Sequence, residues 1–366
     1  MVDELITIAE AIGRIRPVDL DAKSRAEARQ ATLTKPPGSL GRLEALSVQL
    51  AGIFGSETPR VRDRVVVVAA GDHGVVSRGV TGYPQEVTAQ MVMNFLAGGA
   101  AVSVMCRNLG VRQVIVDAGV SSNLPDHLEL RVLKVGRGTA DISRGPAMTR
   151  EQADRCVLEG IKLTVELAEA GNDLIATGDM GIGNTTSSSA ITSAITGRHP
   201  QETTGAGTGR TPEELEQKIG VVGSALDVNA PDPNDGLDVL AKVGGFEIGV
   251  LAGVILGGAM MRRAVVIDGF ISGAAALIAH KMSSNVIDYV IPAHVSAERG
   301  HRALLSWMGL SPLLDLNMRL GEGTGAVVAM PIIDAAAACL SEMATFSDAG
   351  VSDRDPDSGP ANDQGP

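Results

Sequence analysis

Aromatic residues are scarce in this chain of 366 residues, where Phe, Trp and Tyr together make up 2%. Proteins that bind single-stranded nucleic acid stack its bases on aromatic side chains, so this scarcity argues against that class. Positive charge is also in the minority, because 31 Lys and Arg stand against 43 Asp and Glu, which gives a net charge of −12. A chain this acidic has no general attraction for nucleic acid or for anionic membranes, so we expect neither as a partner.

Cysteine is rare as well. Cys106, Cys156 and Cys339 are far apart and odd in number, which predicts neither a disulfide framework nor a metal site but buried thiols in a reducing compartment. The first residues carry acids where a secretory signal would be positive, and the apolar stretch 248–261 is too short to span a bilayer. We therefore expect a soluble, cytoplasmic protein.

Small and aliphatic residues are abundant, with 44 Gly and 44% hydrophobic residues. Short apolar runs rich in Val and Ile end in small, acidic or histidine residues, at 65–70, 114–116, 174–176, 265–267 and 286–291. Helical patterns separate these runs, so the sequence predicts an α/β fold with a doubly wound, mainly parallel sheet flanked by helices. Ligands of such sheets bind beyond the carboxyl ends of the strands, where Asp72, Asp117, Asp179, Asp268 and His294 lie.

Capping signals mark several helices. Thr149 with Gln152 and Thr211 with Glu214 form capping boxes, and Ser39 follows a Pro-Pro-Gly turn as an expected N-cap. The first sixty residues and the stretch 313–346 have helical patterns, the latter with Pro331 as a kink or as the start of a new helix. Residues 347–366 lack an apolar pattern and are expected to form a disordered tail.

The glycine-rich loop at 178–186 follows a predicted strand and precedes a helix of small residues. Its glycines can expose backbone N–H groups at the start of that helix, which is typical of a phosphate cradle without a basic residue. The same pattern is also typical of a tight turn that binds nothing. Its candidate binding residues are Gly178, Gly181, Ile182, Gly183, Asn184 and Thr185.

A second glycine-rich loop at 205–209 contains Gly207 and Thr208 and leads into the helix that carries Lys218. Lys218 lies at the edge of the apolar stripe of that helix, so it can reach a phosphate in a cleft or remain an ordinary surface lysine.

Glu322 lies between two glycines in an apolar stretch. Apolar surroundings raise the pKa of a carboxyl group and make its anion a good proton acceptor. The alternative is a helix-end carboxylate that interacts with the helix dipole. The acids and histidines at the strand ends do not have the spacing of a known metal motif, so we expect no metal.

Several segments together resemble the nicotinate-nucleotide–dimethylbenzimidazole phosphoribosyltransferase family, over roughly residues 30–346. The segments that carry the resemblance are 35–44, 71–74, 83–88, 178–186, 242–247, 268–272, 294–298 and 318–326. The resemblance implies a homodimer, and a large Rossmann-like domain at 61–310 with a small helical domain built from 1–60 and 311–346. It also implies transfer of phosphoribose from nicotinate mononucleotide to a benzimidazole base, with inversion at C1′ and without a cofactor.

The resemblance assigns roles to individual residues. Glu322 matches the general base, and Asp179 stands where relatives often carry Glu, so a carboxylate near the reacting atoms is also implied there. The loop 178–186, the Gly207 loop and Lys218 match phosphate-binding positions. Tyr83, Met91, Met180 and Leu320 match the base pocket, and Tyr83 replaces a small hydroxyl residue, which leaves the preferred base open.

Two other functions remain compatible with the fold class. A nucleotide-dependent oxidoreductase would need the dinucleotide glycine pattern and an acidic residue placed for a ribose, and the sequence has neither. A non-catalytic nucleotide sensor would bind nicotinate mononucleotide without consuming it.

Overall fold

The computed structural model describes residues 7–205 and 211–352. The described part forms two compact units, a larger one of residues 7–18 and 61–331 and a smaller one of residues 19–60 and 332–352. The cavity and the candidate site residues belong to the larger unit.

A parallel sheet forms the centre of the larger unit, and its strand order is β3-β2-β1-β4-β5-β6. The strands are β1 (Asp63–Gly71), β2 (Arg112–Gly119), β3 (Leu130–Val132), β4 (Asn172–Met180), β5 (Ala264–Ile267) and β6 (Val290–Pro292). The order reverses direction at β1 and β4, so the crossovers must run on both faces of the sheet. The doubly wound α/β fold expected from the sequence is therefore confirmed.

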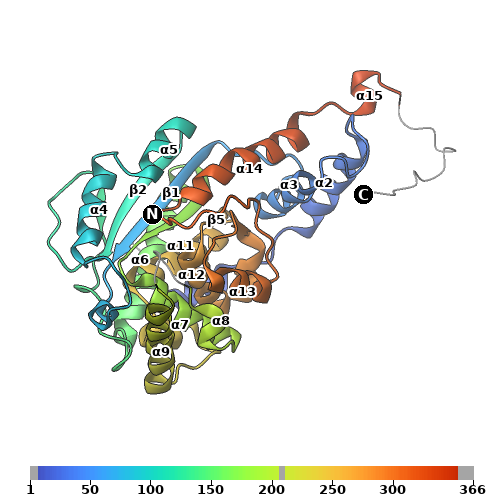
Figure 1. Ribbon diagram of the computed structural model, residues 1–366. Helices are drawn as coiled ribbons and strands as arrows, with labels where there is room; N and C mark the ends of the chain where they lie inside the picture. The colour runs from blue at the N-terminus through green and yellow to red at the C-terminus, as the bar shows by residue number, and fades with distance from the viewer. Residues whose placement is uncertain (1–6, 206–210, 353–366) are drawn as a thin grey trace. The chain divides into compact units, whose positions relative to one another are not determined.

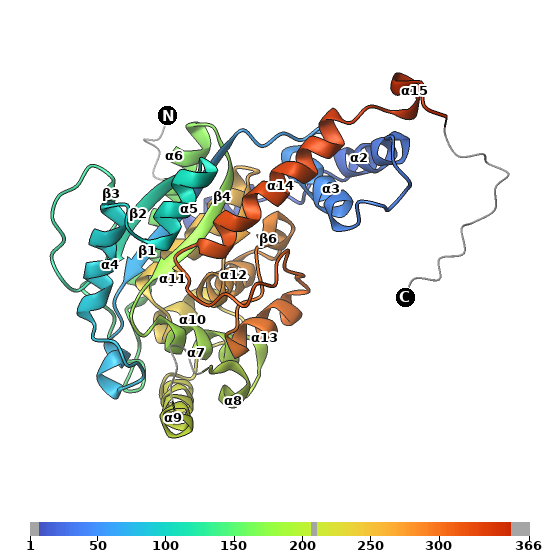
Figure 2. The same ribbon diagram turned by 45° about the horizontal axis from the view of Figure 1, so that its top comes forward.

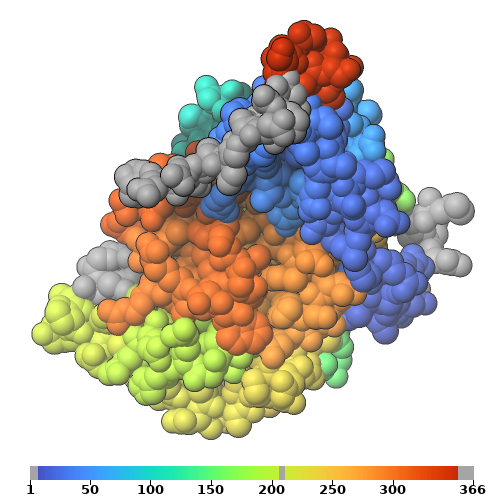
Figure 3. All heavy atoms as spheres, turned by 90° about the vertical axis from the view of Figure 1, so that its right-hand side faces the viewer, coloured from blue at the N-terminus to red at the C-terminus, as the bar shows by residue number. Residues whose placement is uncertain are grey.

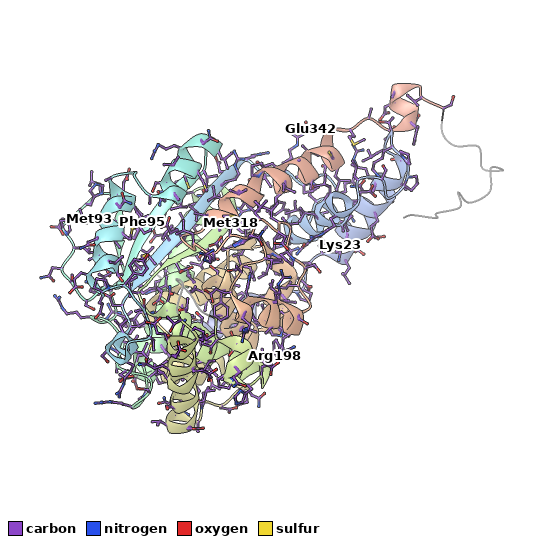
Figure 4. The ribbon with its side chains drawn as sticks, in the orientation of Figure 1. Lys23, Met93, Phe95, Arg198, Met318 and Glu342 are labelled. Carbon is purple, nitrogen blue, oxygen red and sulfur yellow. The ribbon has the colours of Figure 1, made fainter. Side chains whose placement is uncertain are left out.

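Helices cover both faces of this sheet (Figure 1). On one face lie α4 (Glu86–Leu96) and α5 (Ala101–Leu109), and on the other lie α6 (Arg150–Glu169), α11 (Phe246–Met260) and α12 (Phe270–Met282), as the turned view also shows (Figure 2). On α4, Phe95 is buried and Met93 is 40% exposed, and Figure 4 shows their positions along the helix. The central helix α11 is buried almost all round, which explains why its sequence is apolar apart from Glu247 in the first turn.

The larger unit contains further elements besides the sheet and these helices. They are α1 (Ile8–Arg14), η1 (Gly74–Arg78), α7 (Asn184–Thr196), α8 (Pro200–Thr203), α9 (Pro212–Asn229), α10 (Gly236–Val243), η2 (Ser284–Tyr289), α13 (Arg299–Met308) and the start of α14 (Thr324–Glu342). The capping boxes of Thr149 and Thr211 are both present. Helices α8 and α13 pack against each other at the surface (Figure 3).

Three local expectations were wrong. Residues 286–289 form η2 rather than a strand, so β6 is only three residues long. Residues 313–323 are not helical, and α14 begins at Thr324 with Pro331 inside it. The N-cap of α3 (Arg42–Phe54) is Gly41, with φ 53°, rather than Ser39, because an additional turn follows the prolines.

The smaller unit is helical and includes α2 (Leu20–Thr32), α3, the second half of α14 and α15 (Phe346–Ala349). Its core consists of Ala26, Leu33, Val48, Ala51 and Leu340. The guanidinium of Arg29 donates hydrogen bonds to the carbonyl oxygens of Leu340, Ser341 and Met343, which satisfies the end of α14.

The unit boundaries differ from the expected ones at both ends of the chain. Residues 7–18 and 311–331 were expected in the small domain and group with the larger unit instead. The contacts explain this grouping for the first segment, since Tyr289 Oη donates to the carbonyl of Arg16 at 2.9 Å. Part of the expected tail belongs to α15, and residues 353–366 lie outside the described residues.

Two apolar segments, Glu86–Leu109 and Thr324–Glu342, are long enough by length and composition to cross a membrane. Both are longer than the stretch 248–261 considered in the sequence. Glu86–Leu109 comprises two helices that pack on the sheet, and more than half of the most apolar window in Thr324–Glu342 is buried. Core helices have these same properties.

Candidate functional site

A cavity opens at the carboxyl ends of β4, β5 and β6. Its lining includes Asp179 to Thr185 at the end of β4 and in the loop that follows, Gly269 to Ile271 after β5, and His294, Ser296 and Glu298 after β6. Val80, Thr81, Tyr83, Lys218, Arg319, Leu320 and Gly321 complete it. This position next to the reversal of strand order is where doubly wound sheets bind their ligands.

The loop between β4 and α7 forms one wall of the cavity. It turns sharply at Gly183, whose φ of 96° is accessible to glycine at little cost, and α7 begins directly afterwards at Asn184. A Cβ at Gly181 would lie 2.5 Å from the carbonyl oxygen of Gly71, so only glycine fits there. Since the loop places the N-terminus of a 13-residue helix at the cavity, the wall has a positive potential.

Lys218 reaches this wall from α9 and is only 1% exposed. Its ammonium group donates hydrogen bonds to Thr185 Oγ1 at 2.9 Å and to the carbonyl of Gly205 at 3.4 Å. The surface-lysine alternative is therefore wrong. A buried cation beside a helix N-terminus favours an anion in the cavity. Gly207 and Thr208 lie outside the described residues.

Glu322 is 4% exposed and has φ 63°, a left-handed conformation that non-glycine residues rarely adopt. Its Oε2 accepts a hydrogen bond from the amide of Val102, in the first turn of α5, at 3.5 Å. Burial raises the pKa of Glu322, and the Val102 N–H opposes that rise. A carboxylate whose pKa is raised in this way is a better proton acceptor than an exposed one.

Asp179 adjoins Glu322 through the backbone, because the Glu322 N–H donates to the Asp179 carbonyl at 3.2 Å. Its Oδ2 accepts a hydrogen bond from Asn184 Nδ2 at 2.9 Å, and its Oδ1 has no hydrogen-bond partner in the described structure. Burial raises the pKa of Asp179 well above the usual range, and the nearby Asp268 and Glu247 carboxylates add to this rise. The two candidate catalytic carboxylates are thus brought together.

Gly178 explains this close approach. A Cβ at Gly178 would lie 2.5 Å from the carbonyl oxygen of Glu322, so the end of β4 and the Glu322 backbone touch directly. Gly178 therefore belongs to the packing behind the cavity and does not line it.

Only some of the residues expected in the base pocket line the cavity. Tyr83, Met180 and Leu320 line the cavity, with Tyr83 51% and Leu320 59% exposed. Met91 lies on α4 and is not among the lining residues. Glu322 is not among the lining residues, although its neighbour Gly321 is.

Sequence reasoning placed His294 at a strand end without a role in binding, and it missed the lining residues Ser296, Glu298 and Arg319. Three of these four residues belong to the segment 294–298 that contributed to the family resemblance, which was the available signal. Burial raises the pKa of Glu298, against the opposing charges of Lys218 and Arg319. Burial lowers the pKa of His294.

A buried ion pair lies beneath the loop after β4. His73 Nε2 is 2.7 Å from Glu247 Oε1, and His73 Nδ1 is 3.1 Å from Ser187 Oγ on α7. Both side chains of the pair are fully buried. Burial opposes the charged form of His73, but the Glu247 carboxylate outweighs it and raises the pKa of His73. The pair therefore connects the loop after β1, the start of α11 and α7.

Comparison with known proteins agrees with this geometry. A family model described as phosphoribosyltransferase matches residues 15–351. A nicotinate-nucleotide–dimethylbenzimidazole phosphoribosyltransferase of Roseiflexus sp. strain RS-1 is 58% identical over 345 residues, which cover 94% of this chain and 98% of that protein. One from Chloroflexus aggregans is 54% identical over 347 residues, covering 95% and 98%.

A solved structure is similar as well. The crystal structure of nicotinate-nucleotide–dimethylbenzimidazole phosphoribosyltransferase from Thermus thermophilus superposes with a TM-score of 0.87 at 45% identity. The match covers 92% of this chain and 100% of that chain.

Proposed function

The chain belongs to the nicotinate-nucleotide–dimethylbenzimidazole phosphoribosyltransferase family, and from this premise we propose the reaction and the role of each site residue. The enzyme transfers phosphoribose from nicotinate mononucleotide to 5,6-dimethylbenzimidazole or a related base. The products are nicotinate and α-ribazole 5′-phosphate, the precursor of the lower ligand of cobalamin. The observation that carries the proposal is the convergence of a buried lysine, a helix N-terminus and buried carboxylates on one cavity.

The phosphate of the nucleotide binds between the loop 181–185 and Lys218. Backbone N–H groups at the start of α7 and the Lys218 ammonium supply the positive charge that the acidic chain lacks overall. Gly207 and Thr208 are proposed to complete this subsite, as the family resemblance implies.

The acceptor base enters between Tyr83, Met180 and Leu320, whose side chains provide apolar faces at the mouth of the cavity. Met91 is proposed as a more distant member of this pocket. A flat heterocycle in this place would cover Leu320 and bring its ring N–H toward Glu322, the neighbour of Gly321.

The chemical step needs one proton acceptor. One ring nitrogen of the base attacks C1′ while the C1′–N bond to nicotinate breaks, and the bonding pair returns to the pyridine nitrogen. Glu322 takes the N–H proton from the other ring nitrogen of the base. Attack from the face opposite the leaving group inverts C1′ from β to α. The ionised form of Asp179 stabilises the positive charge that develops on the ribose.

The cationic ring of the nucleotide is itself the activated leaving group, so no metal or cofactor is needed in this mechanism. A homodimer, a cytoplasmic location, and the absence of nucleic-acid and membrane partners remain part of the proposal. The division into a Rossmann-like domain and a small helical domain is also part of the proposal.

Product identification tests the reaction. The purified protein is incubated with nicotinate mononucleotide and dimethylbenzimidazole, and the products are separated and identified by mass spectrometry. We expect free nicotinate and ribazole phosphate in equal amounts, with the α configuration visible in the NMR coupling of H1′. Binding of the nucleotide without turnover would favour the sensor alternative, and binding of NADH would favour the oxidoreductase.

A further inference from the structure

Asp268 has no role in the mechanism above, although it is completely buried beside the site. It follows β5, and both carboxylate oxygens accept hydrogen bonds from backbone amides 55 and 58 residues further along the chain. Oδ2 accepts from Gly323 N at 3.2 Å and Oδ1 accepts from Ala326 N at 2.9 Å. These amides belong to the segment that directly follows Glu322.

That segment has an unusual backbone. Gly321, Glu322 and Gly323 have φ values of 83°, 63° and 89°, so three consecutive residues are left-handed. The middle one is not a glycine, and its conformation persists only if its surroundings hold it.

The contacts that hold Glu322 come from three different elements. Its own N–H donates to the Asp179 carbonyl at 3.2 Å, and its carboxylate accepts from Val102 at 3.5 Å. The residues after it are held by Asp268. The first amides of a helix have no hydrogen-bond acceptors within that helix, and a side chain just before the helix often accepts from them. Gly323 precedes α14 and has no side chain, so the Asp268 carboxylate accepts the hydrogen bond instead.

Close packing also restricts the backbone of Glu322 and of the residue after it. A Cβ at Gly178 would lie 2.5 Å from the Glu322 carbonyl oxygen, and one at Gly323 would lie 2.7 Å from Val66 Cγ2. The backbone around Glu322 therefore packs against the end of β4 and against Val66 in β1, and Asp268 connects it to the end of β5.

We propose that Asp268 is a positioning residue for Glu322, because its carboxylate fixes the backbone that places the proton acceptor. This inference rests on the proposed function, in which Glu322 is the base. Burial raises the pKa of Asp268 to about 7, opposed by the amides of Ala326, Gly323 and Gly325, which agrees with a carboxylate that is retained for a specific contact.

The test replaces Asp268 by Asn, which preserves its shape and one acceptor but presents an N–H group to a second amide. We expect kcat to fall about 10- to 100-fold, the order of loss that follows a displacement of about 1 Å. The KM for nicotinate mononucleotide should change less than about threefold, because Lys218 and the loop after β4 are untouched.

A matched control is available in Asp235. This aspartate also caps a helix, since its Oδ1 accepts from Leu237 N and Asp238 N at 3.0 and 3.1 Å, but that helix is α10 and not the segment that follows Glu322. Asp235→Asn should lower the melting temperature without lowering kcat. If both variants lowered kcat equally, general destabilisation would explain the loss and the proposal would fail.

A double-mutant cycle tests whether Asp268 affects catalysis through Glu322 or only by supporting the fold. If Asp268 acts through Glu322, then Asp268→Asn should have less than about a threefold effect on kcat in a Glu322→Gln background. Full additivity would overturn the proposal. An active Glu322→Gln variant would instead refute the assignment of Glu322 as base, which is a failure of the proposed function.

Asp268→Ser is a second variant, since its hydroxyl keeps one acceptor in a smaller volume. It should show the same loss in kcat with an unchanged KM for the nucleotide. If neither variant folds, the proposal is also wrong, because Asp268 would then be needed for folding rather than for the placement of Glu322.

Discussion

His73 and Glu247 form a fully buried ion pair, with 2.7 Å between Nε2 and Oε1. The pair lies under the loop that builds the cavity wall, because a Cβ at Gly181 would be 3.4 Å from Glu247 Oε1. Removing one partner of such a pair leaves an uncompensated charge in an apolar environment.

Glu247→Gln should therefore destabilise the protein by about 3–5 kcal/mol, as breaking a buried pair typically does. Urea unfolding followed by circular dichroism measures the change. The destabilisation should also depend on pH. The raised pKa of His73 means that its contribution is fully present below about pH 6.5 and is lost as the pH rises through its folded value. A difference between wild type and variant that stays constant from about pH 5.5 to about pH 9 would contradict this account.

Lys218→Ala should weaken binding of nicotinate mononucleotide about 10- to 100-fold, because a charge-assisted hydrogen bond to phosphate contributes roughly 1.5–3 kcal/mol. Binding of dimethylbenzimidazole should change little. Isothermal titration calorimetry with each substrate gives both affinities. Lys162→Ala, which removes a partly exposed lysine paired with Glu159 on α6, is the control. Equal losses for the two substrates would contradict a phosphate contact.

Asp179→Asn should change how stability varies with pH. Folding raises the pKa of Asp179, so its contribution to stability is largest below its ordinary pKa of about 4 and is lost as the pH rises through the folded value. The wild type therefore carries an unfavourable buried charge at high pH that the variant lacks. The melting temperature of the variant relative to wild type should be higher at about pH 8 than at about pH 5. The opposite trend would show that the Asp179 anion is stabilised in the fold.

Extensive dialysis against EDTA should leave kcat unchanged, because the nucleotide supplies its own cationic leaving group. The activity is measured before and after dialysis, with calcium-saturated EDTA as a control. A loss that one particular divalent ion restores would require a metal in the mechanism.

The sequence predicted the fold where local signals were strong. The runs at 65–70, 114–116, 174–176 and 265–267 became strands because they are β-branched and buried on both faces. The run at 286–291 was misinterpreted, since a short stretch that is apolar apart from Asp288 does not by itself distinguish a strand from a 3-10 helix. The start of α14 was also misplaced, because it is capped by Asp268 from a distant strand.

The residues of the candidate site could be predicted mainly from the segments that resemble the family. Local sequence allowed Lys218 to be either a surface lysine or a phosphate ligand. Tertiary packing excludes the first by burying the side chain against Thr185, and the second remains a proposal. The end of a predicted strand indicated His294, but Ser296 and Glu298 lack any spacing that suggests a ligand, and only the fold brings them to the cavity. The glycines on either side of Glu322 are compatible with its left-handed backbone. Its hydrogen bond from Val102 could not be predicted, because Val102 lies on α5, far away in the sequence.

Glu322→Gln tests the central claim, that a buried carboxylate takes the proton of the incoming base. The variant keeps the shape and a hydrogen bond but cannot accept the proton, so it should fold and bind both substrates while kcat falls about 10²–10⁴-fold. Glu166→Gln, at a half-exposed carboxylate paired with Arg131, should retain the wild-type kcat. The decisive measurement is single-turnover release of nicotinate from a preformed ternary complex across about pH 5–9. The account predicts a slow rate that rises less steeply with pH than the acid limb of the wild type. A Glu322→Gln rate within a fewfold of wild type would contradict it, and the proton would have to go to another group.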